Sequence, residues 1–303
     1  MATTPIPEPV QWKHQDQPTV SIKDIVGLTE HRVNVTALDF DILEALLRYN
    51  FMTSQQAARL WKVSLRTTNY RFRMLFQWGL VDRGVLPSKT IGGRQLVYTL
   101  SQRGYEVLKR TENSLAVAWR DDWKPKSEMG SQRLSVFHEL GRNDVCIALC
   151  ESAKARQHPV IDWEGSREAG QRFVANATTH EWHSIYPDAV LMLDTMQPLF
   201  IEYERSGRDS KFQQKVRTMR TYLVSQQWQT RYPREPWIIY AIPAGLGTQG
   251  VIGGSYGGMV ASAGMTGARN YIIMDEDAWV DGTWTATRGD GTVGNLWEFL
   301  GVM

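Results

Sequence analysis

Three helical periods of apolar residues follow one another between residues 39 and 79. The first starts at Asp39, a suitable N-cap, and its apolar positions share one helix face: Ile42, Leu43, Leu46 and Leu47. The second opens with Thr53 and Gln56 at the spacing of a capping box, in which each side chain satisfies a free amide at the helix start. The third begins after Ser64. The pattern predicts three short helices joined by tight turns.

The third predicted helix has two unlike faces. One face is mostly apolar (Leu65, Thr68, Phe72, Leu75 and Phe76), and the opposite face carries Arg66, Asn69, Tyr70 and Arg73. Two strand-like runs, 80–86 and 94–100, flank a Pro- and Gly-containing turn with Lys89, and helical spacing resumes over 101–110. We therefore expect three helices, a β-hairpin and a fourth helix.

Positive charge is concentrated in this part of the chain. Residues 59–110 contain eleven Lys and Arg residues and two acidic residues, whereas the whole chain of 303 residues has a net charge of +2. A basic module suggests a polyanionic partner, and a solvated basic face is the alternative. Order, spacing and charge together make residues 36–112 resemble a winged-helix domain, a form of helix-turn-helix.

The winged-helix resemblance implies binding to double-stranded DNA. Arg and Asn side chains of the third helix can pair with base edges in the major groove, and Arg can also pair with phosphates. The DNA-binding residues that it implies are Arg66, Asn69, Tyr70, Arg71 and Arg73 of this helix, and Lys89 and Arg94 of the hairpin. A winged helix that contacts protein is the alternative.

The second half of the chain has a different order of elements. Residues 133–303 read as helix, strand, hairpin, basic amphipathic helix and strand, which is a mixed α/β order. Residues 1–35 read as a flexible Pro-rich arm and 113–132 as a linker. The expected fold class is α+β, with two domains at 36–112 and 133–303.

Three carboxylates interrupt the apolar strands of the second domain. Asp188 precedes one strand, and Glu202 and Glu204 are two residues apart on the next. With the hairpin turn centred near Met196, Asp188 lies opposite Glu204 and the three acids share one face. Clustered acids repel one another unless a cation lies among them, and magnesium prefers oxygen ligands. A one-residue shift of register would separate them, and pairing with Lys215, Arg217 or Arg220 is the structural alternative.

The segments around these acids, "YPDAVLMLD" and "FIEYERSG", resemble the PD-(D/E)XK nuclease core. Together with "FHELGRNDVCIAL" and "RTYL", the layout of residues 38–242 resembles the replication-relaxation family of plasmids and integrative elements. The resemblance implies a restriction-endonuclease-like second domain with Mg²⁺ or Mn²⁺ as cofactor. It implies metal-binding roles for Asp188, Glu202 and Glu139, whereas the catalytic role expected of Glu204 comes from its position on the same strand face as the other two acids. The lysine of the motif is replaced by Glu204, so Lys215, or less readily Lys211, would substitute for it.

Three functions follow from these patterns. The first is a DNA-binding protein of a mobile element that acts in replication initiation or in DNA relaxation and transfer, and that nicks DNA by metal-dependent hydrolysis. The second is a non-catalytic initiator or transcription regulator, and the third is a module that recruits replication or transfer proteins. A homodimer is left open. We expect a cytoplasmic protein without a membrane partner, because no apolar run reaches the ~18 residues of a membrane helix and Cys146 and Cys150 read as core residues.

Overall fold

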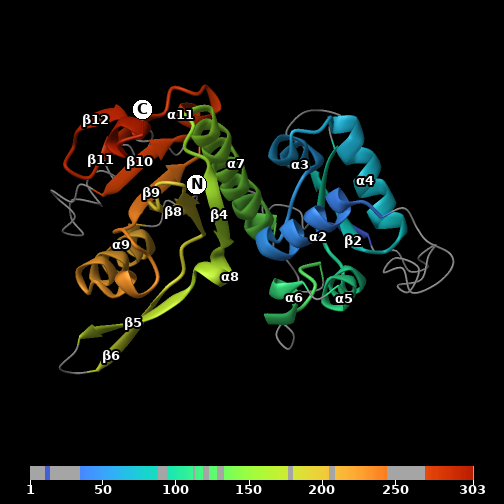
Figure 1. Cartoon of the computed structure of the whole chain (residues 1–303), viewed down its shortest axis with the longest axis horizontal. Helices are drawn as coiled ribbons and strands as arrows, with labels where there is room; N and C mark the ends of the chain where they lie inside the picture. The colour runs from blue at the N-terminus through green and yellow to red at the C-terminus, as the bar shows by residue number, and fades with distance from the viewer. Residues whose placement is uncertain are drawn as a thin grey trace, which may run out of the picture. The chain divides into compact units, whose positions relative to one another are not determined.

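The structure is a computed structural model, and it describes residues 11–13, 35–87, 94–111, 113–118, 123–127, 133–176, 180–204, 209–243 and 270–302 (Figure 1). The chain divides into two compact units, Met1–Asn143 and Asp144–Met303. Both units contain helices and strands, which confirms the mixed α+β class. No helix in these ranges combines the length and the apolar character needed to cross a membrane.

The N-terminal unit follows the predicted order of three helices, a hairpin and a helix. Its elements are α2 (Ala37–Tyr49), α3 (Ser54–Trp61), α4 (Leu65–Gln77), β2 (Val81–Pro87), β3 (Arg94–Leu100) and α5 (Gln102–Arg110). β2 and β3 are antiparallel, and β1 (Gln11–Lys13), from the segment read as an arm, adds a third strand beside β2. A short helix, α6 (Ser114–Ala118), falls within the segment read as a linker.

Helix starts in this unit are set by side-chain caps. The predicted capping box of α3 is confirmed, because Thr53 Oγ1 accepts from the Gln56 amide at 3.2 Å and Gln56 Oε1 accepts from the Thr53 amide at 3.1 Å. Ser64 caps α4 as predicted, accepting from Thr67 N at 3.1 Å. The predicted cap of α2 is wrong: Thr36 is the N-cap and Asp39 lies one turn in, accepting from Thr36 N at 2.7 Å.

The apolar face of α4 is confirmed only in part. Thr68, Phe72 and Leu75 are fully buried, whereas Leu65, in the first turn, is 44% exposed. Phe76 is partly buried under the Arg83 guanidinium, which lies 4.3 Å from its ring centre. The middle and the end of α4 therefore pack in the core, whereas its first turn is exposed to solvent.

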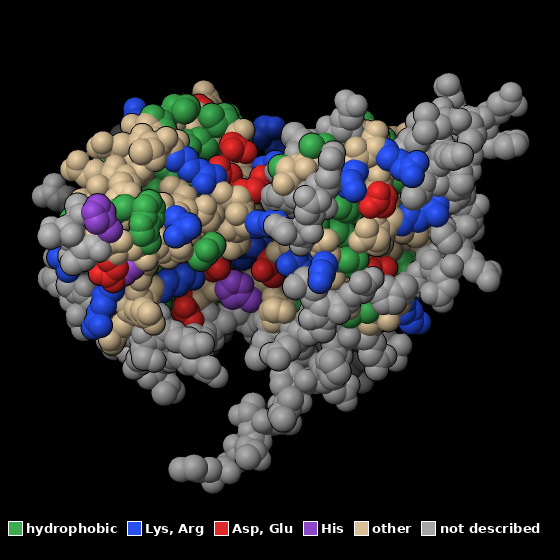
Figure 2. Space-filling view, turned by 90° about the horizontal axis from the view of Figure 1, so that it is seen from below, with side chains coloured by type: hydrophobic (Ala, Val, Ile, Leu, Met, Phe, Trp, Pro, Cys, Tyr) green, Lys and Arg blue, Asp and Glu red, His purple; other side chains and the backbone are tan. Residues whose placement is uncertain are grey.

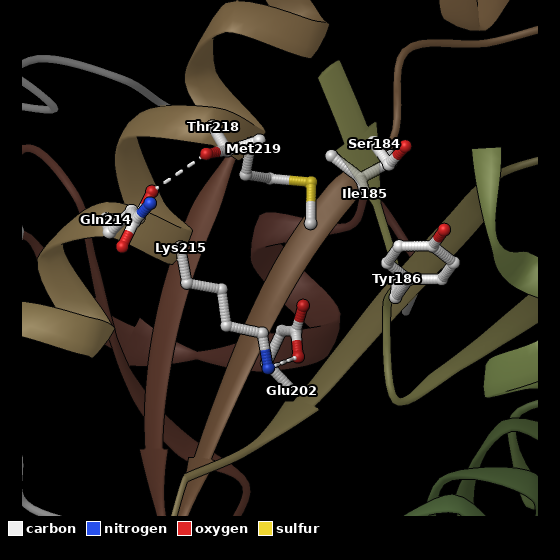
Figure 3. Close-up of a pocket in the computed structure, with 8 residues that line it drawn as sticks. All are labelled: Ser184, Ile185, Tyr186, Glu202, Gln214, Lys215, Thr218 and Met219. Carbon is white, nitrogen blue, oxygen red and sulfur yellow. Dashed lines mark hydrogen bonds and ion pairs between the residues drawn. The ribbon is translucent and has the colours of Figure 1, made fainter. Parts of the chain in front are cut away.

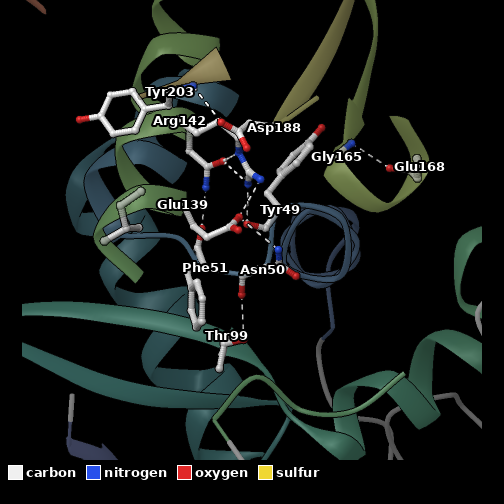
Figure 4. A network of polar contacts seen from close by, with 12 residues as sticks. Tyr49, Asn50, Phe51, Thr99, Glu139, Arg142, Gly165, Glu168, Asp188 and Tyr203 are labelled. Atoms are coloured by element: carbon white, nitrogen blue, oxygen red, sulfur yellow. Dashed lines mark hydrogen bonds and ion pairs between the residues drawn. The ribbon is translucent and has the colours of Figure 1, made fainter. Parts of the chain in front are cut away.

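The long helix α7 (Arg133–Ala155) is divided between the units after Asn143. Its buried Val136 and Leu140 pack with Phe51, Leu86 and Val97 of the N-terminal unit. Buried Arg142 donates to the Tyr49 carbonyl at 2.9 Å (Figure 4). Asn143, also buried, donates to the Phe51 carbonyl at 2.7 Å. The division lies C-terminal to the predicted linker 113–132 because the first turns of α7 supply these contacts.

The C-terminal unit is built on a seven-stranded sheet with the order β12-β11-β10-β9-β8-β7-β4. The strands are β4 (Val160–Gly165), β7 (Ala189–Leu193), β8 (Pro198–Tyr203), β9 (Trp237–Ile242), β10 (Tyr271–Asp275), β11 (Thr285–Arg288) and β12 (Val293–Asn295). β8, β9 and β10 are parallel, and the other neighbours are antiparallel. The edge strand β4 has an irregular register between Val160 and Asp162.

Helix α9 (Asp209–Val224) connects β8 to β9 and covers one face of the sheet. Its Phe212, Val216 and Met219 join a core that includes Phe200 and Tyr240 of the strands. The predicted order of helix, strand, hairpin, helix and strand is confirmed by α7, β4, β7–β8, α9 and β9. The other helices described in this unit are α8 (Ser166–Ala169), η1 (Gln227–Thr230), α11 (Glu276–Val280) and α12 (Leu296–Phe299).

A separate hairpin extends away from the large sheet (Figure 1). It consists of β5 (Gln171–Asn176) and β6 (Glu181–Ile185). Its inner side chains, Phe173 and Ile185, are buried in the same core as α9. The hairpin is therefore fixed at its base to α9.

Candidate functional site

The register of β7 and β8 places two acids side by side. Ala189 pairs with Ile201 and Val190 with Phe200, so Asp188, directly before β7, lies opposite Glu202. The predicted pairing of Asp188 with Glu204 is wrong by two residues, because the turn is centred one residue earlier than Met196. A two-residue change keeps the same face of a strand. Asp188 and Glu202 therefore share one face, as predicted.

Lys215 joins these acids from α9. Its ammonium contacts Oε2 of Glu202 (Figure 3) and lies 3.7 Å from Oδ2 of Asp188. Asp188 Oδ2 also accepts a hydrogen bond from the Tyr203 amide at 2.8 Å. Glu202 is 1% exposed, and its Oε1 has no hydrogen-bond partner among the residues described. The site is a buried carboxyl group beside a second acid and a lysine.

Burial controls the proton affinities of this site. It raises the pKa of Glu202 to about 8, and the Lys215 charge opposes that shift while Asp188 adds to it. Burial alone would lower the pKa of Lys215, but the Asp188 and Glu202 carboxylates outweigh it and hold that pKa above its ordinary value. Lys215 therefore stays charged, and Glu202 is the group that titrates near neutral pH.

A pocket of about 370 Å³ opens above the Glu202–Lys215 pair. Its walls come from α9 and from the end of β6, and the lining residues are Ser184, Ile185, Tyr186, Glu202, Gln214, Lys215, Thr218 and Met219. Figure 3 shows Tyr186 and Lys215 on opposite sides of this pocket. The wall from β6 was not predicted, because the burial along β6 does not alternate and gives no strand period to recognise.

The other two predicted acids have different partners. Glu204 follows β8 and is half-buried; its amide donates to the Ala241 carbonyl at 3.0 Å, and its charge helps to raise the pKa of Lys215. Glu139 belongs to the N-terminal unit, where it accepts from Asn50 at 3.1 Å and pairs with Arg142 at 2.6 Å. Within the described ranges, no three His, Cys, Asp or Glu side chains gather closely enough to hold a metal ion. The structure thus brings Asp188, Glu202 and Lys215 into contact, and the charge of Glu204 acts on the same lysine.

The outer face of α4 presents the side chains predicted for it. Arg66, Asn69, Tyr70 and Arg73 are all exposed, and the Arg73 guanidinium lies 5.4 Å from the Tyr70 ring centre. On the molecular face in Figure 2, described Lys and Arg side chains are interspersed with neutral and acidic ones. On that face charge alone does not mark a binding surface, so we define the α4 face by its four exposed side chains.

Arg71 does not belong to that outer face. It is buried and its Nε donates to Asp39 Oδ1 at 2.7 Å, so the predicted role in the groove is corrected to a link between α4 and α2. Lys89 lies outside the described residues, as do the side chains of Arg94 and Lys211. Tyr222 of α9 is buried and donates to Gln171 at 2.6 Å, so it links α9 to the start of β5.

Comparison with known proteins adds one finding. Searches of curated proteins and of solved structures gave no match. A family profile described as replication-relaxation matches residues 43–236, a stretch that includes both the outer face of α4 and the Asp188–Glu202–Lys215 site. Since that match covers more than half of the chain, the chain belongs to the replication-relaxation family.

Proposed function

We propose that this chain is a DNA-binding protein in the replication or relaxation of a plasmid or other mobile element, and that α4 binds duplex DNA. Family membership supports the first part of this proposal. The exposed set of Arg66, Asn69, Tyr70 and Arg73 on one capped helix carries the second.

The chemistry of the α4 face suits a major groove. Arginine can pair with the O6 and N7 atoms of guanine, and asparagine with the N6 and N7 atoms of adenine. Burial of Arg71 against Asp39 fixes the helix to its neighbour, so that the outer side chains are presented on a rigid element. The following strands β2 and β3 form the hairpin expected of a winged-helix domain.

Duplex binding by wild type and the double variant Arg66→Ala/Arg73→Ala tests this proposal. Each lost contact costs about 1–3 kcal/mol, so the double variant should bind at least about thirtyfold more weakly. The slope of log affinity against log salt should fall by about 1 for each arginine that contacts phosphate. Arg288→Ala is the control, because its guanidinium is paired with Asp290 in the other unit. Unchanged affinity in the double variant would overturn the assignment to α4.

Metal-dependent nicking is a second candidate function, favoured by the contact of one lysine with both acids. A donor set of two carboxylates fits Mg²⁺, which proteins bind through one or two carboxylates with waters and substrate phosphates. Asp188 and Glu202 would hold the ion, and the unused Oε1 of Glu202 is a ready donor. The ion would supply an activated water and offset charge on the phosphate. Lys215 would hold a phosphate oxygen from the α9 side.

Nicking of supercoiled plasmid DNA with Mg²⁺ or Mn²⁺ tests the second function. Glu202→Gln and Asp188→Asn should abolish nicking, and Lys215→Met should reduce it at least about a hundredfold, the usual loss for a charge-stabilising group. Asp290→Asn, on an exposed turn, is the control. Nicking that survives in Glu202→Gln overturns the site. A wild type that binds DNA and never nicks it supports the non-catalytic alternative, in which this unit is a scaffold.

A further inference from the structure

The outer face of the β5–β6 hairpin has the composition of a nucleic-acid surface. Arg172 pairs with Ser184 and Val174 with Trp182, so these four side chains share the face opposite buried Phe173. Trp182 is 57% exposed, and the Arg172 guanidinium lies 5.4 Å from its ring centre. Among the described residues of this face none is acidic.

Tyr186 continues the same face toward the pocket. It is 62% exposed and lies two residues beyond Ser184. Its ring lies against Gly170, where an added Cβ would come within 2.8 Å of Cδ1. Glycine at this position therefore lets the ring lie on the backbone with its other side open. An aromatic residue held in this way is pre-ordered for stacking.

The pocket beside Tyr186 connects the outer face of the hairpin to the ammonium group of Lys215. Tyr186 lines one side, and Lys215, Gln214 and Thr218 line the α9 side (Figure 3). Further cations, Arg217 and Arg220, are exposed on α9. A planar, partly polar group can enter between Tyr186 and Met219, while an attached anion reaches Lys215. A nucleobase with its phosphate has both parts.

We propose that the outer face of the β5–β6 hairpin, with the pocket at its base, binds single-stranded DNA. Bases stack on Trp182 and Tyr186, and phosphates meet Arg172 and Lys215. Stacking of this kind requires unpaired bases, because bases in a duplex are stacked on each other and show only their edges in the grooves. The inference rests on the proposed function for its ligand class, and it assigns unpaired DNA to this unit and duplex DNA to α4.

Fluorescence anisotropy of the full chain tests this proposal. The probes are a labelled oligothymidylate of about 20 nucleotides, longer than the ~4–16 nucleotides that one such surface covers, and a duplex of equal length. Trp182→Ala/Tyr186→Ala should bind the single strand at least about thirtyfold more weakly, since each lost stack costs about 1–3 kcal/mol, with duplex affinity unchanged. Trp182→Phe/Tyr186→Phe should retain most of the affinity, because phenyl rings still stack. Ile161→Ala, at a 56% exposed apolar position on β4, is the control.

The outcomes separate this inference from the role of α4. Single-strand affinity that is the same in Trp182→Ala/Tyr186→Ala as in wild type overturns it, as does an equal loss in the Ile161→Ala control. A wild type that binds duplex but no single strand also overturns it and leaves α4 in place. If the wild type binds the single strand but no duplex, and Trp182→Ala/Tyr186→Ala loses single-strand binding, then only the role of α4 is overturned. Because Trp182 and Tyr186 are exposed, thermal melting should show that these variants remain folded.

Discussion

In each unit a buried acid is paired with a basic side chain, Asp39 with Arg71 and Glu202 with Lys215, and the two pairs differ in how completely they are satisfied. Asp39 is fully buried and uses both oxygens, one with Arg71 Nε at 2.7 Å and the other with the amide and hydroxyl of Thr36 at 2.7 and 2.9 Å. Glu202 is equally buried, but its Oε1 accepts nothing among the described residues. The first pair joins two helices, whereas the second faces a pocket and is open to a ligand.

The largest expected effect comes from breaking the satisfied pair. Asp39→Ala leaves the Arg71 guanidinium without its principal buried acceptor and removes the hydrogen bonds at the start of α2. Loss of one partner of a buried ion pair costs about 3–5 kcal/mol. We expect the free energy of unfolding of the N-terminal unit to fall by about this amount, measured by urea denaturation with circular dichroism. A loss under about 1 kcal/mol would show that Asp39 and Arg71 do not form a buried pair.

The second effect concerns the pH dependence of Glu202. Its pKa is raised from 4.5 to about 8 in the folded chain, so folding favours the protonated form. The protonated Glu202 therefore stabilises the fold fully below about pH 4.5. This stabilisation, roughly 2–5 kcal/mol, is lost as the pH rises through about 8. Lys215 keeps its charge across this window, because its pKa is raised as well.

The variant Glu202→Gln sharpens this test, because it keeps the shape and removes the titration. In wild type the free energy of unfolding should fall between pH 4.5 and 8 as Glu202 loses its proton. In Glu202→Gln this fall should be absent, measured by urea denaturation at several pH values. Asp290→Asn, which changes an exposed carboxylate, should keep the wild-type decline in the same window. A profile of Glu202→Gln that runs parallel to wild type would mean that Glu202 is not the titrating group.

The smallest effect comes from a single cap in the N-terminal unit. Thr53→Ala removes the side-chain oxygen that accepts from the Gln56 amide. Loss of an N-cap costs about 1 kcal/mol, and thermal melting should show a correspondingly small decrease in Tm. Thr53→Ser keeps the acceptor and should lie close to wild type. An alanine variant as stable as the serine variant would mean that the cap does not stabilise α3.

Local signals in the sequence predicted more of this structure than long-range ones did. The caps at Thr53 and Ser64 and the outer face of α4 depend on neighbouring residues alone, and they were predicted correctly. Burial of Arg71 depends on Asp39, which is 32 residues away in sequence, and no helical period shows that contact. The outer position of Arg66 follows from the helical period, whereas the inner position of Arg71 follows from tertiary packing.

The acid site shows the same limit. Alternation along the strands placed Asp188 and Glu202 on one face, because that property survives a two-residue error in register. The wall of the pocket formed by Tyr186 depends on the packing of a hairpin against α9, and only the three-dimensional structure shows it. The role of Glu139 came from resemblance, and its observed partners are Asn50 and Arg142. The role of Glu204 came from strand alternation, and its charge acts on Lys215.

The irregular register of β4 has a consequence for handling the protein in solution. β4 is one edge of the large sheet, and a long regular edge offers unpaired amides and carbonyls to the edge of another molecule. The irregular register between Val160 and Asp162 interrupts the regular series of amides and carbonyls along β4. The opposite edge strand, β12, is only three residues long. Edge-to-edge polymerisation is disfavoured at both ends, so concentrated samples should resist amyloid-like association through this sheet.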